Sequence, residues 1–350
     1  MNLSIYILTF IFGYLVTLIL IPINIKFSRK YNIIDKPHDR GIHHEDTPSA
    51  GGLSFGVTLI LLQLVLYIIN ELKVFEINNG DKFIYIMIGC ILMLILGFLD
   101  DKKKFTARYK LFFQILIVCF MYLKGFRMDI LTNPIGPDIY LGVFTFPMTI
   151  IWFILVINAF NLIDGLDGLA AGIASIVSFI LLVVGIAFNN SFISLMSIML
   201  LSTNVAFLRF NFFPAKIFMG DTGSLILGFC IAAVSVAGTE QYKGITTMTM
   251  LVPITVLILP LGDTLLAVYR RMKHRKHIFQ ADKEHIHHKL LDLGFSQKII
   301  ALISYFITFM FGLIALGFSF TSKKILFLVL IFVALILIMI GYLFVKGTKK

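Results

Sequence analysis

Acidic side chains and amides stand at the ends of long apolar segments of this chain, or inside them. They are Asp100, Asp101, Asn158, Asn161, Asp164, Asp167, Asp221, Asp263, Asp282 and Glu284. Polar groups near hydrocarbon are costly, so a functional site is the first hypothesis for them. Because the 350-residue chain has only 19 Asp and Glu in total, this concentration indicates chemistry.

Two adjacent carboxylates, Asp100 and Asp101, close one apolar segment. They could serve as a stop signal at the membrane interface, but Lys102–Lys104 follow directly and already supply one. Neighbouring carboxylates repel each other, which raises the pKa of one of them, or they share a divalent cation. We interpret the pair as a candidate general base or cation site.

Four polar residues follow a spacing of three: Asn158, Asn161, Asp164 and Asp167. On a helix, residues three apart are neighbours, so consecutive members would form one polar ridge. Their carboxylate and amide oxygens suit Mg²⁺ better than a soft metal. The alternative is a tight polar turn with a capping aspartate.

Asp221 opens another apolar segment, between Gly220 and Gly223. A helix N-terminus flanked by glycines binds phosphate, and a carboxylate there can hold Mg²⁺. Simple capping of the helix by Asp221 or Thr222 is the alternative. Asp263 lies inside its segment, about 10 Å from the inner surface at helical rise. Either a structural hydrogen bond or a proton relay would explain it.

Two polar loops add cations and histidines. The later loop holds His285, His287 and His288 beside Asp282 and Glu284. This spacing is not that of helical zinc-binding pairs, and histidines beside Arg and Lys favour phosphate binding or acid–base chemistry. The earlier loop carries polar residues that could frame a substrate pocket: Asp35, Lys36, His38, Arg40, His43 and His44. A solvated basic loop is the alternative for the later loop.

The elements that must position these groups are membrane helices. The chain is 59% hydrophobic and 14% charged, with a mean hydropathy of +0.94, far from the composition of a soluble domain. We expect an all-α polytopic membrane protein, with residues 1–350 forming a single domain. Eleven spans are predicted, at roughly 3–25, 52–70, 83–99, 110–124, 147–161, 167–188, 191–208, 223–238, 245–269, 298–318 and 325–345. Turn residues in 125–147 predict a small external β-hairpin.

The basic residues predict the orientation. With the N-terminus outside, 23 of the 30 Lys and Arg fall on the inner side, as the positive-inside rule requires. The C-terminus and the polar loops are then cytoplasmic. The net charge of +11 therefore reports topology, and we expect no nucleic-acid partner. Cys90, Cys119 and Cys230 lie in apolar spans, which predicts core packing.

Five stretches together resemble one family, the polyprenyl-phosphate N-acetylhexosamine-1-phosphate transferases (glycosyltransferase family 4). They are DKPHDRGIHHEDTPSAGG, LGFLDD, NAFNLIDGLDGLAAG, NFFPAKIFMGDTGSLILG and ADKEHIHHKL, in the family's order over residues 35–290. The resemblance implies transfer of a sugar-1-phosphate from a UDP-HexNAc donor to a polyprenyl phosphate, with release of UMP. It implies Mg²⁺, replaceable by Mn²⁺, and a multi-pass protein of the cell membrane with a cytoplasmic active site.

The resemblance also implies roles for residues. Asp221 and Asn161 hold the metal, and Asp100 and Asp101 serve the acceptor phosphate, one of them as the base. The catalytic residues are then Asp100, Asp101 and Asp221. The expected substrate-binding residues are Asn158, Asp164, Asp167, Lys36, Arg40, His43, His285, His287 and His288. One-step transfer and a route through an aspartyl-phosphate are both compatible with these residues.

The later loop bears on the donor. Ile286 interrupts its histidines, which resembles the branch that uses UDP-N-acetylglucosamine and undecaprenyl phosphate to begin teichoic acid, O-antigen or similar polymers. The alternative is the phospho-N-acetylmuramoyl-pentapeptide transferase of peptidoglycan synthesis. Outside this family, an ion-coupled transporter and a metal-dependent membrane hydrolase are the rival readings. A homodimer is expected from family analogy alone.

Overall fold

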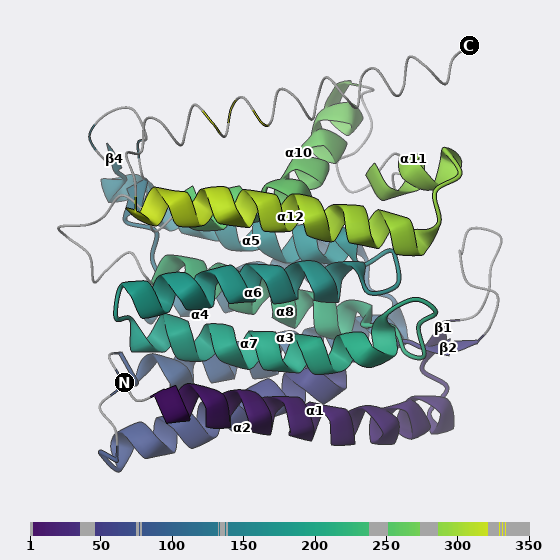
Figure 1. Ribbon diagram of the computed structural model, residues 1–350, viewed down its shortest axis with the longest axis horizontal. Coiled ribbons are helices and arrows are strands. Elements are labelled where there is room, and N and C mark those ends of the chain that lie inside the picture. The colour runs from purple at the N-terminus through teal and green to yellow at the C-terminus, as the bar shows by residue number, and fades with distance from the viewer. Residues whose placement is uncertain are drawn as a thin grey trace.

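The chain folds into a bundle of long helices that run alongside one another (Figure 1). The computed structural model describes residues 3–35, 46–74, 77, 79–131, 133, 137, 139–237, 251–273, 286–320, 329, 331 and 333. The helices are α1 (Leu3–Lys30), α2 (Gly52–Glu71), α3 (Lys82–Lys103), α4 (Ala107–Leu123), α5 (Thr145–Ile163), α6 (Leu169–Ala187), α7 (Ser191–Asn211), α8 (Gly220–Ala237), α9 (Leu251–Val256), α10 (Ile258–Lys273), α11 (Ile286–Asp292) and α12 (Gln297–Phe320). The predicted all-α membrane fold is confirmed.

Eight helices in the described part of the chain are long and apolar enough to cross a membrane: α1, α2, α3, α5, α6, α7, α8 and α12. Helix α4 matches the predicted span 110–124 but has only 17 residues. The predicted span 245–269 corresponds to α9 and α10, with a turn at Leu257 between them, and its residues 245–250 lie outside the described residues. Most of the predicted span 325–345 lies outside the described residues.

Helix α8 is the central element of the bundle. Its most apolar 18-residue window is 89% buried, against 28% for α1. A helix that is apolar on all sides must be surrounded by other elements, and α3 and α5 pack against α8. The residues at the start of α8, which include Asp221, are therefore held in place from several directions.

The buried side of α1 is unusual because it is largely polar or small. Thr9, Gly13, Thr17, Asn24 and Ser28 all face the bundle. Thr17 donates to the Thr58 hydroxyl at 3.1 Å, and the Asn24 amide donates to the Ala50 carbonyl at 2.7 Å. In hydrocarbon, where apolar surfaces gain little by meeting, such bonds and close packing hold helices together.

Short strands mark the two ends of the bundle. Strand β1 (Ile34–Asp35) pairs antiparallel with β2 (Thr47–Pro48), and β3 (Ile130–Leu131) pairs antiparallel with β4 (Ile139–Tyr140). The second pair confirms the predicted hairpin within 125–147. The two pairs lie at opposite ends of the molecule, and α1 begins at the β4 end (Figure 1).

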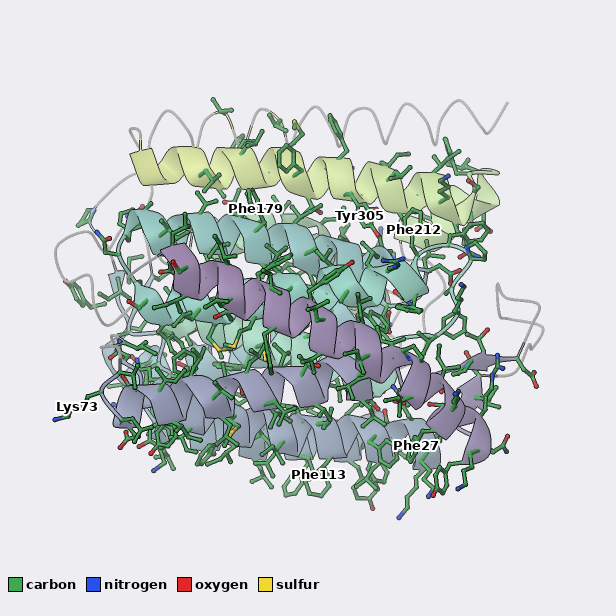
Figure 2. The ribbon with its side chains drawn as sticks, turned by 60° about the horizontal axis from the view of Figure 1, so that its bottom comes forward. Phe27, Lys73, Phe113, Phe179, Phe212 and Tyr305 are labelled. Carbon is green, nitrogen blue, oxygen red and sulfur yellow. The ribbon has the colours of Figure 1, made fainter. Side chains whose placement is uncertain are left out.

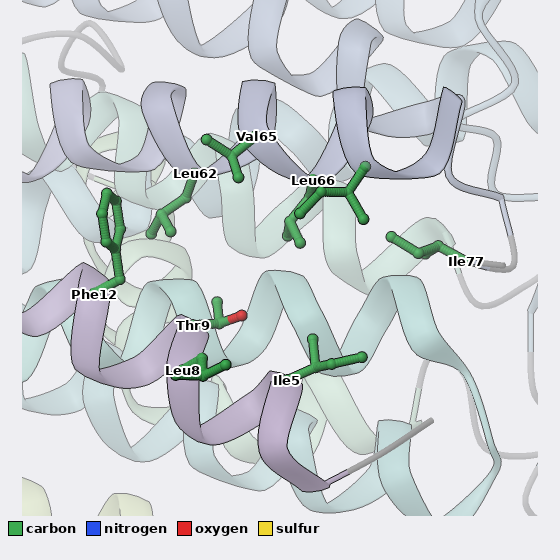
Figure 3. Close-up of a pocket in the computed structure, with 9 residues that line it drawn as sticks. Ile5, Leu8, Thr9, Phe12, Leu62, Val65, Leu66 and Ile77 are labelled. Carbon is green, nitrogen blue, oxygen red and sulfur yellow. The ribbon is translucent and has the colours of Figure 1, made fainter. Parts of the chain in front are cut away.

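An apolar groove of about 290 Å³ runs between the first turns of α1 and the later turns of α2 (Figure 3). Its lining residues are Ile5, Leu8, Thr9, Phe12, Leu62, Val65, Leu66, Ile69 and Ile77. Because α1 begins at the β4 end (Figure 1), the groove lies far along the bundle from the β1–β2 pair. None of the acidic residues singled out in the sequence lines this groove.

Candidate functional site

Three charged side chains from three helices form the centre of the candidate site. The amino group of Lys110, on α4, lies 2.6 Å from a carboxylate oxygen of Asp100 and forms a second ion pair with Asp221. The Asp100 side chain is only 7% exposed. One ammonium thus lies between two carboxylates and offsets part of the repulsion that they would otherwise have near hydrocarbon. The structure brings together Asp100 and Asp221, which lie at the ends of two spans and are 121 residues apart in sequence.

An amide completes this centre on the side of α5. The Asn161 side chain donates to the free oxygen of the Asp221 carboxylate at 2.6 Å and to the Ser224 hydroxyl at 2.9 Å. The positions of amide oxygen and nitrogen are assigned from such contacts, so a turned amide would present its oxygen to the same place. The predicted metal pair, Asn161 and Asp221, is therefore adjacent in space.

Asp101 binds the start of α8. Its carboxylate accepts the backbone N–H of Asp221 at 2.8 Å and that of Thr222 at 3.0 Å, and it accepts the Thr222 hydroxyl at 2.5 Å. The first N–H groups of a helix have no partner within the helix, and an acid there also meets the positive end of its dipole. Asp101, from another helix, thus performs the capping that we had considered for Asp221 and Thr222 themselves.

Gly220 allows the chain to enter α8 at this point. It has φ +69°, and a Cβ there would stand 1.9 Å from the Ser49 carbonyl oxygen, so glycine is required on both counts. The end of the earlier loop runs alongside the segment that leads into α8. The N–H groups of Gly51 and Gly52 donate to the carbonyls of Phe218 and Met219, both at 2.9 Å. The described part of that loop therefore supports the start of α8.

Helices α3 and α8 approach each other closely over several turns. A Cβ at Gly97 would lie 2.5 Å from the Asp221 carbonyl oxygen, and one at Gly89 would lie 2.2 Å from the Phe229 ring. Farther along, the sulfurs of Cys90 and Cys230 are 3.3 Å apart and fully buried. Both cysteines pack in the core, as expected. Such contacts fix the distance between the helix that carries Asp100 and the one that carries Asp221.

The predicted polar ridge divides between a helix and a turn. Helix α5 ends at Ile163, so Asn158 and Asn161 lie on it, whereas Asp164 and Asp167 lie in the turn before α6. Asn158 contacts Gln114, donating to its side-chain oxygen at 3.2 Å. The expectation that consecutive members share one helical ridge was correct only for the first two residues.

Asp164 is a titratable group of this turn whose pKa is shifted by its surroundings. Burial of the carboxyl raises its pKa well above the usual value, and the negative charges of Asp221, Asp101 and Asp167 raise it further. Asp164 therefore lies within the electrostatic field of the central carboxylates. Any cation bound there would lower its pKa again.

Asp167 fastens the turn to the segment before α8. Its carboxylate accepts the backbone N–H of Ala215 at 2.9 Å. The neighbouring Gly168 donates its N–H to the Asn211 side chain at 3.1 Å, and the Asn211 amide donates to the Ile217 carbonyl at 2.9 Å. These bonds tie the turn to the chain that leads into Asp221.

Asp263 lies apart from these contacts, in α10. It is buried and lines a small cavity of about 20 Å³ together with Ile163, Leu290 and Ser304. The cavity is bounded by residues from five helices, and all of them except Asp263 and Ser304 are apolar. This location inside the bundle is compatible with a structural hydrogen bond and with a proton relay, so both stay predictions for Asp263.

Several predicted site residues fall outside the described residues: Lys36, Arg40, His43 and His285. Asp282 and Glu284 do so too. His287 and His288 belong to α11, but their side chains are likewise outside the description. Among the residues that are described, no three of His, Cys, Asp and Glu form a metal-binding group. Mg²⁺ does not require one, because it binds through one or two carboxylates together with substrate phosphates and water.

Lys110 is the main residue that the sequence reasoning missed, since it had been counted only among the basic residues that set topology. A signal was available. Gln114, Ile117, Val118 and Met121 form the buried side of α4, and Lys110 precedes Gln114 by one helical turn. A lysine that continues a buried stripe needs an anionic partner.

The fold and the site define a class: multi-pass membrane proteins with a carboxylate-rich centre suited to phosphate chemistry. Comparison with known proteins identifies the family. A model of glycosyl transferase family 4 matches residues 83–239, the stretch that holds Asp100, Lys110, Asn161 and Asp221. The chain belongs to glycosyl transferase family 4, the polyprenyl-phosphate HexNAc-1-phosphate transferases.

Curated relatives match along nearly the whole chain. A probable undecaprenyl-phosphate N-acetylglucosaminyl 1-phosphate transferase of Bacillus subtilis is 33% identical over 94% of this chain and 90% of its own length. A phospho-N-acetylmuramoyl-pentapeptide-transferase of Caldicellulosiruptor bescii is 30% identical over 89% and 96%. A decaprenyl-phosphate N-acetylglucosaminephosphotransferase of Mycolicibacterium smegmatis is 29% identical over 82% and 75%.

Membership has direct consequences. The protein is a multi-pass membrane phosphotransferase of cell-envelope biosynthesis. The family implies a UDP-sugar donor and a polyprenyl phosphate acceptor, and its members generally depend on a metal ion. The predicted family is confirmed.

Proposed function

We propose that this protein transfers N-acetylglucosamine-1-phosphate from UDP-N-acetylglucosamine to undecaprenyl phosphate and releases UMP, as the first membrane step of a cell-envelope polysaccharide. The observation that carries the proposal is the centre formed by Asp100, Lys110, Asn161 and Asp221 at the end of membrane-length helices. At such a place a water-soluble diphosphate and a lipid phosphate can meet.

The donor atoms of this centre fit Mg²⁺. Two carboxylates and an amide provide hard oxygen ligands, and the position of the Lys110 ammonium between Asp100 and Asp221 supports a cation at this place. Asp221 and Asn161 would hold Mg²⁺, with Mn²⁺ as a substitute. When bound, the ion would neutralise charge on the donor's diphosphate and on the departing UMP.

The protein groups then have separate tasks. An oxygen of the acceptor phosphate attacks the β-phosphorus, and the bond from that phosphorus to the UMP oxygen breaks. Asp100 takes the remaining proton of the acceptor, a modest contribution because the second pKa of a phosphate is about 6. With a metal ion on Asp221, Lys110 would no longer pair with that carboxylate, and its ammonium would bind a phosphate oxygen. Asp101 fixes the start of α8, and Asp164, Asp167 and Asn158 lie on the donor side.

Two observations favour the N-acetylglucosamine donor over the peptidoglycan precursor. The Bacillus relative named for N-acetylglucosamine is 33% identical, against 30% for the muramoyl-pentapeptide relative. In the later loop, Ile286 separates the histidines. The difference in identity between the two relatives is small. The sequence of the later loop and a direct test of donors therefore decide more about the donor.

The proposed topology places the site on the cytoplasmic face, with eleven spans and the N-terminus outside. It is supported by the 23 basic residues on the inner side. The N-terminus also lies at the opposite end of the bundle from the β1–β2 pair (Figure 1), and the chain that follows this pair contacts the start of α8. UDP-sugars are cytosolic, so the donor enters from that side. A homodimer stays a prediction from analogy.

The test is an assay of UMP release by the purified protein in lipid nanodiscs, with a panel of UDP-sugars. We expect release from UDP-N-acetylglucosamine that requires both undecaprenyl phosphate and Mg²⁺. Asp221→Asn should abolish it through loss of metal binding. Equal hydrolysis without the lipid would instead show a hydrolase, and preference for the muramoyl-pentapeptide donor would place the protein in the peptidoglycan branch.

A further inference from the structure

Both polar groups of one glycine are bound by side chains from distant helices. The Gly168 carbonyl accepts the hydroxyl of Tyr305, on α12, at 2.6 Å. The Gly168 N–H donates to Asn211, at the end of α7, at 3.1 Å. Because this carbonyl also accepts the first N–H bond of α6, from Gly172 at 2.9 Å, the tyrosine bond adds to the helix without replacing a helical bond.

The Tyr305 ring is enclosed beside this glycine. A Cβ at Gly172 would stand 2.0 Å from the ring, and one at Gly168 would lie within 3.2 Å of Leu208, Phe212 and the Tyr305 hydroxyl. Figure 2 shows Tyr305 and Phe212 close together at the side of α12. The ring therefore packs against Gly172 of α6, with its hydroxyl at the Gly168 carbonyl.

This glycine ends the turn that carries Asp164 and Asp167. Gly168 has φ +74° and immediately precedes α6, so its backbone sets the direction in which the chain passes from the turn into α6. Asp167 and Asn211 fasten the turn on the side of α8. On the side of the turn that faces α12, the Tyr305 hydroxyl makes the corresponding bond, to the Gly168 carbonyl.

We propose that Tyr305 is a positioning residue of the transfer reaction: its hydroxyl, bonded to the Gly168 carbonyl, holds the Asp164–Asp167 turn in place beside the central carboxylates. The inference rests on the proposed function, in which this turn lies on the donor side. Tyr305 touches no reacting atom. It acts through the turn, and it links α12 to the site.

The test compares Tyr305→Phe, which removes only the hydroxyl, with Tyr122→Phe. Tyr122 packs against Phe146 and Arg127 near the β3–β4 hairpin, so the control makes the same chemical change at the other end of the bundle. We measure kcat, KM for each substrate and thermal stability. Binding of UDP-N-acetylglucosamine without acceptor is measured separately by calorimetry.

One neutral hydrogen bond corresponds to roughly a fivefold change in an equilibrium. For Tyr305→Phe we expect KM and Kd for the donor to rise about fivefold on that basis, with KM for the acceptor and the melting temperature close to the wild type. Gly172→Ala, which pushes the ring, should change the donor constants in the same direction. Tyr122→Phe should match the wild type.

Other results would overturn the inference. Unchanged donor constants in Tyr305→Phe, with a wild-type enzyme that transfers, would show that the hydroxyl positions nothing. A loss of kcat together with a lower melting temperature and unchanged donor binding would show a scaffold role only. A wild-type protein without lipid-dependent transfer would instead refute the proposed function, and the calorimetry would still report on the turn.

Discussion

The carboxylate of Asp101 accepts the backbone N–H of Asp221 at 2.8 Å, so these two acids are joined through the main chain. Its neighbour Asp100 meets Asp221 differently, through the ammonium of Lys110 that both side chains share. Two identical adjacent residues therefore have different tasks. Asp101 fixes where α8 begins, and Asp100 faces the place where chemistry is expected.

The first prediction separates these two tasks. Asp101→Ala leaves the first N–H groups of α8 without a side-chain partner, which should cost about 1 kcal/mol or more and lower the melting temperature in detergent. Asp100→Asn should keep the melting temperature near the wild type and lower turnover modestly, because much of the acceptor phosphate is already deprotonated at neutral pH. Thermal denaturation and UMP release distinguish them. A stable, inactive Asp101→Ala would contradict the assignment.

The second prediction concerns the ion pairs of Lys110. Lys110→Gln leaves Asp100 and Asp221 facing each other without a cation, so the metal-free protein should melt at a lower temperature than the wild type. Mg²⁺ should restore more stability to this variant than to the wild type, since the metal replaces the missing charge. Lys103→Gln, on the exposed end of α3, is the control. An equal response to Mg²⁺ in both variants would argue against a shared cation site.

The third prediction tests the close approach of α3 and α8. Gly97→Ala places a methyl group 2.5 Å from the Asp221 carbonyl oxygen, so the helices must separate. We expect lower stability, by about 1–3 kcal/mol as for other overpacked cores, and a loss of turnover. Gly262→Ala is a matched control, because a Cβ there meets nothing within 4 Å and alanine favours a helix. Wild-type activity in Gly97→Ala would mean that the distance is not critical.

The fourth prediction follows from the raised pKa of Asp164. The folded protein retains this proton to a higher pH than the unfolded chain, whose pKa is near 3.8. Stability from this group is therefore greatest at acidic pH and is lost as pH rises from the unfolded value through the raised one. In EDTA, Asp164→Asn should remove this decline and melt higher than the wild type at neutral pH. Parallel melting curves from pH 5 to 8 would refute the shift.

The sequence predicted those features that depend on local pattern. The long apolar helices and the hairpin within 125–147 follow from composition, turn residues and spacing, and the resemblance paired Asn161 with Asp221, which the structure places side by side. The role of Asp101 could not be predicted, because it depends on how closely α3 passes the start of α8. Lys110 was missed for the same reason: its partners come from other helices.

The polar ridge shows where local reasoning fails. A spacing of three describes a helix face only while the helix continues, and α5 ends at Ile163. Beyond that residue, Asp167 binds Ala215 and Gly168 binds Asn211 and Tyr305. Tertiary contacts, which no spacing encodes, decide where these side chains point.

Gly97 against Asp221, Gly89 against Phe229 and Cys90 against Cys230 hold α3 and α8 together over several turns. We therefore expect Asp100, Asp101 and Asp221 to form one frame that keeps its shape from substrate entry to product release, and we expect movement during turnover to occur in other elements. An inhibitor that fits this frame would meet the same surface at every stage of the cycle, and a variant could escape it only by changes at the rim, because a change in the frame itself would separate its acids.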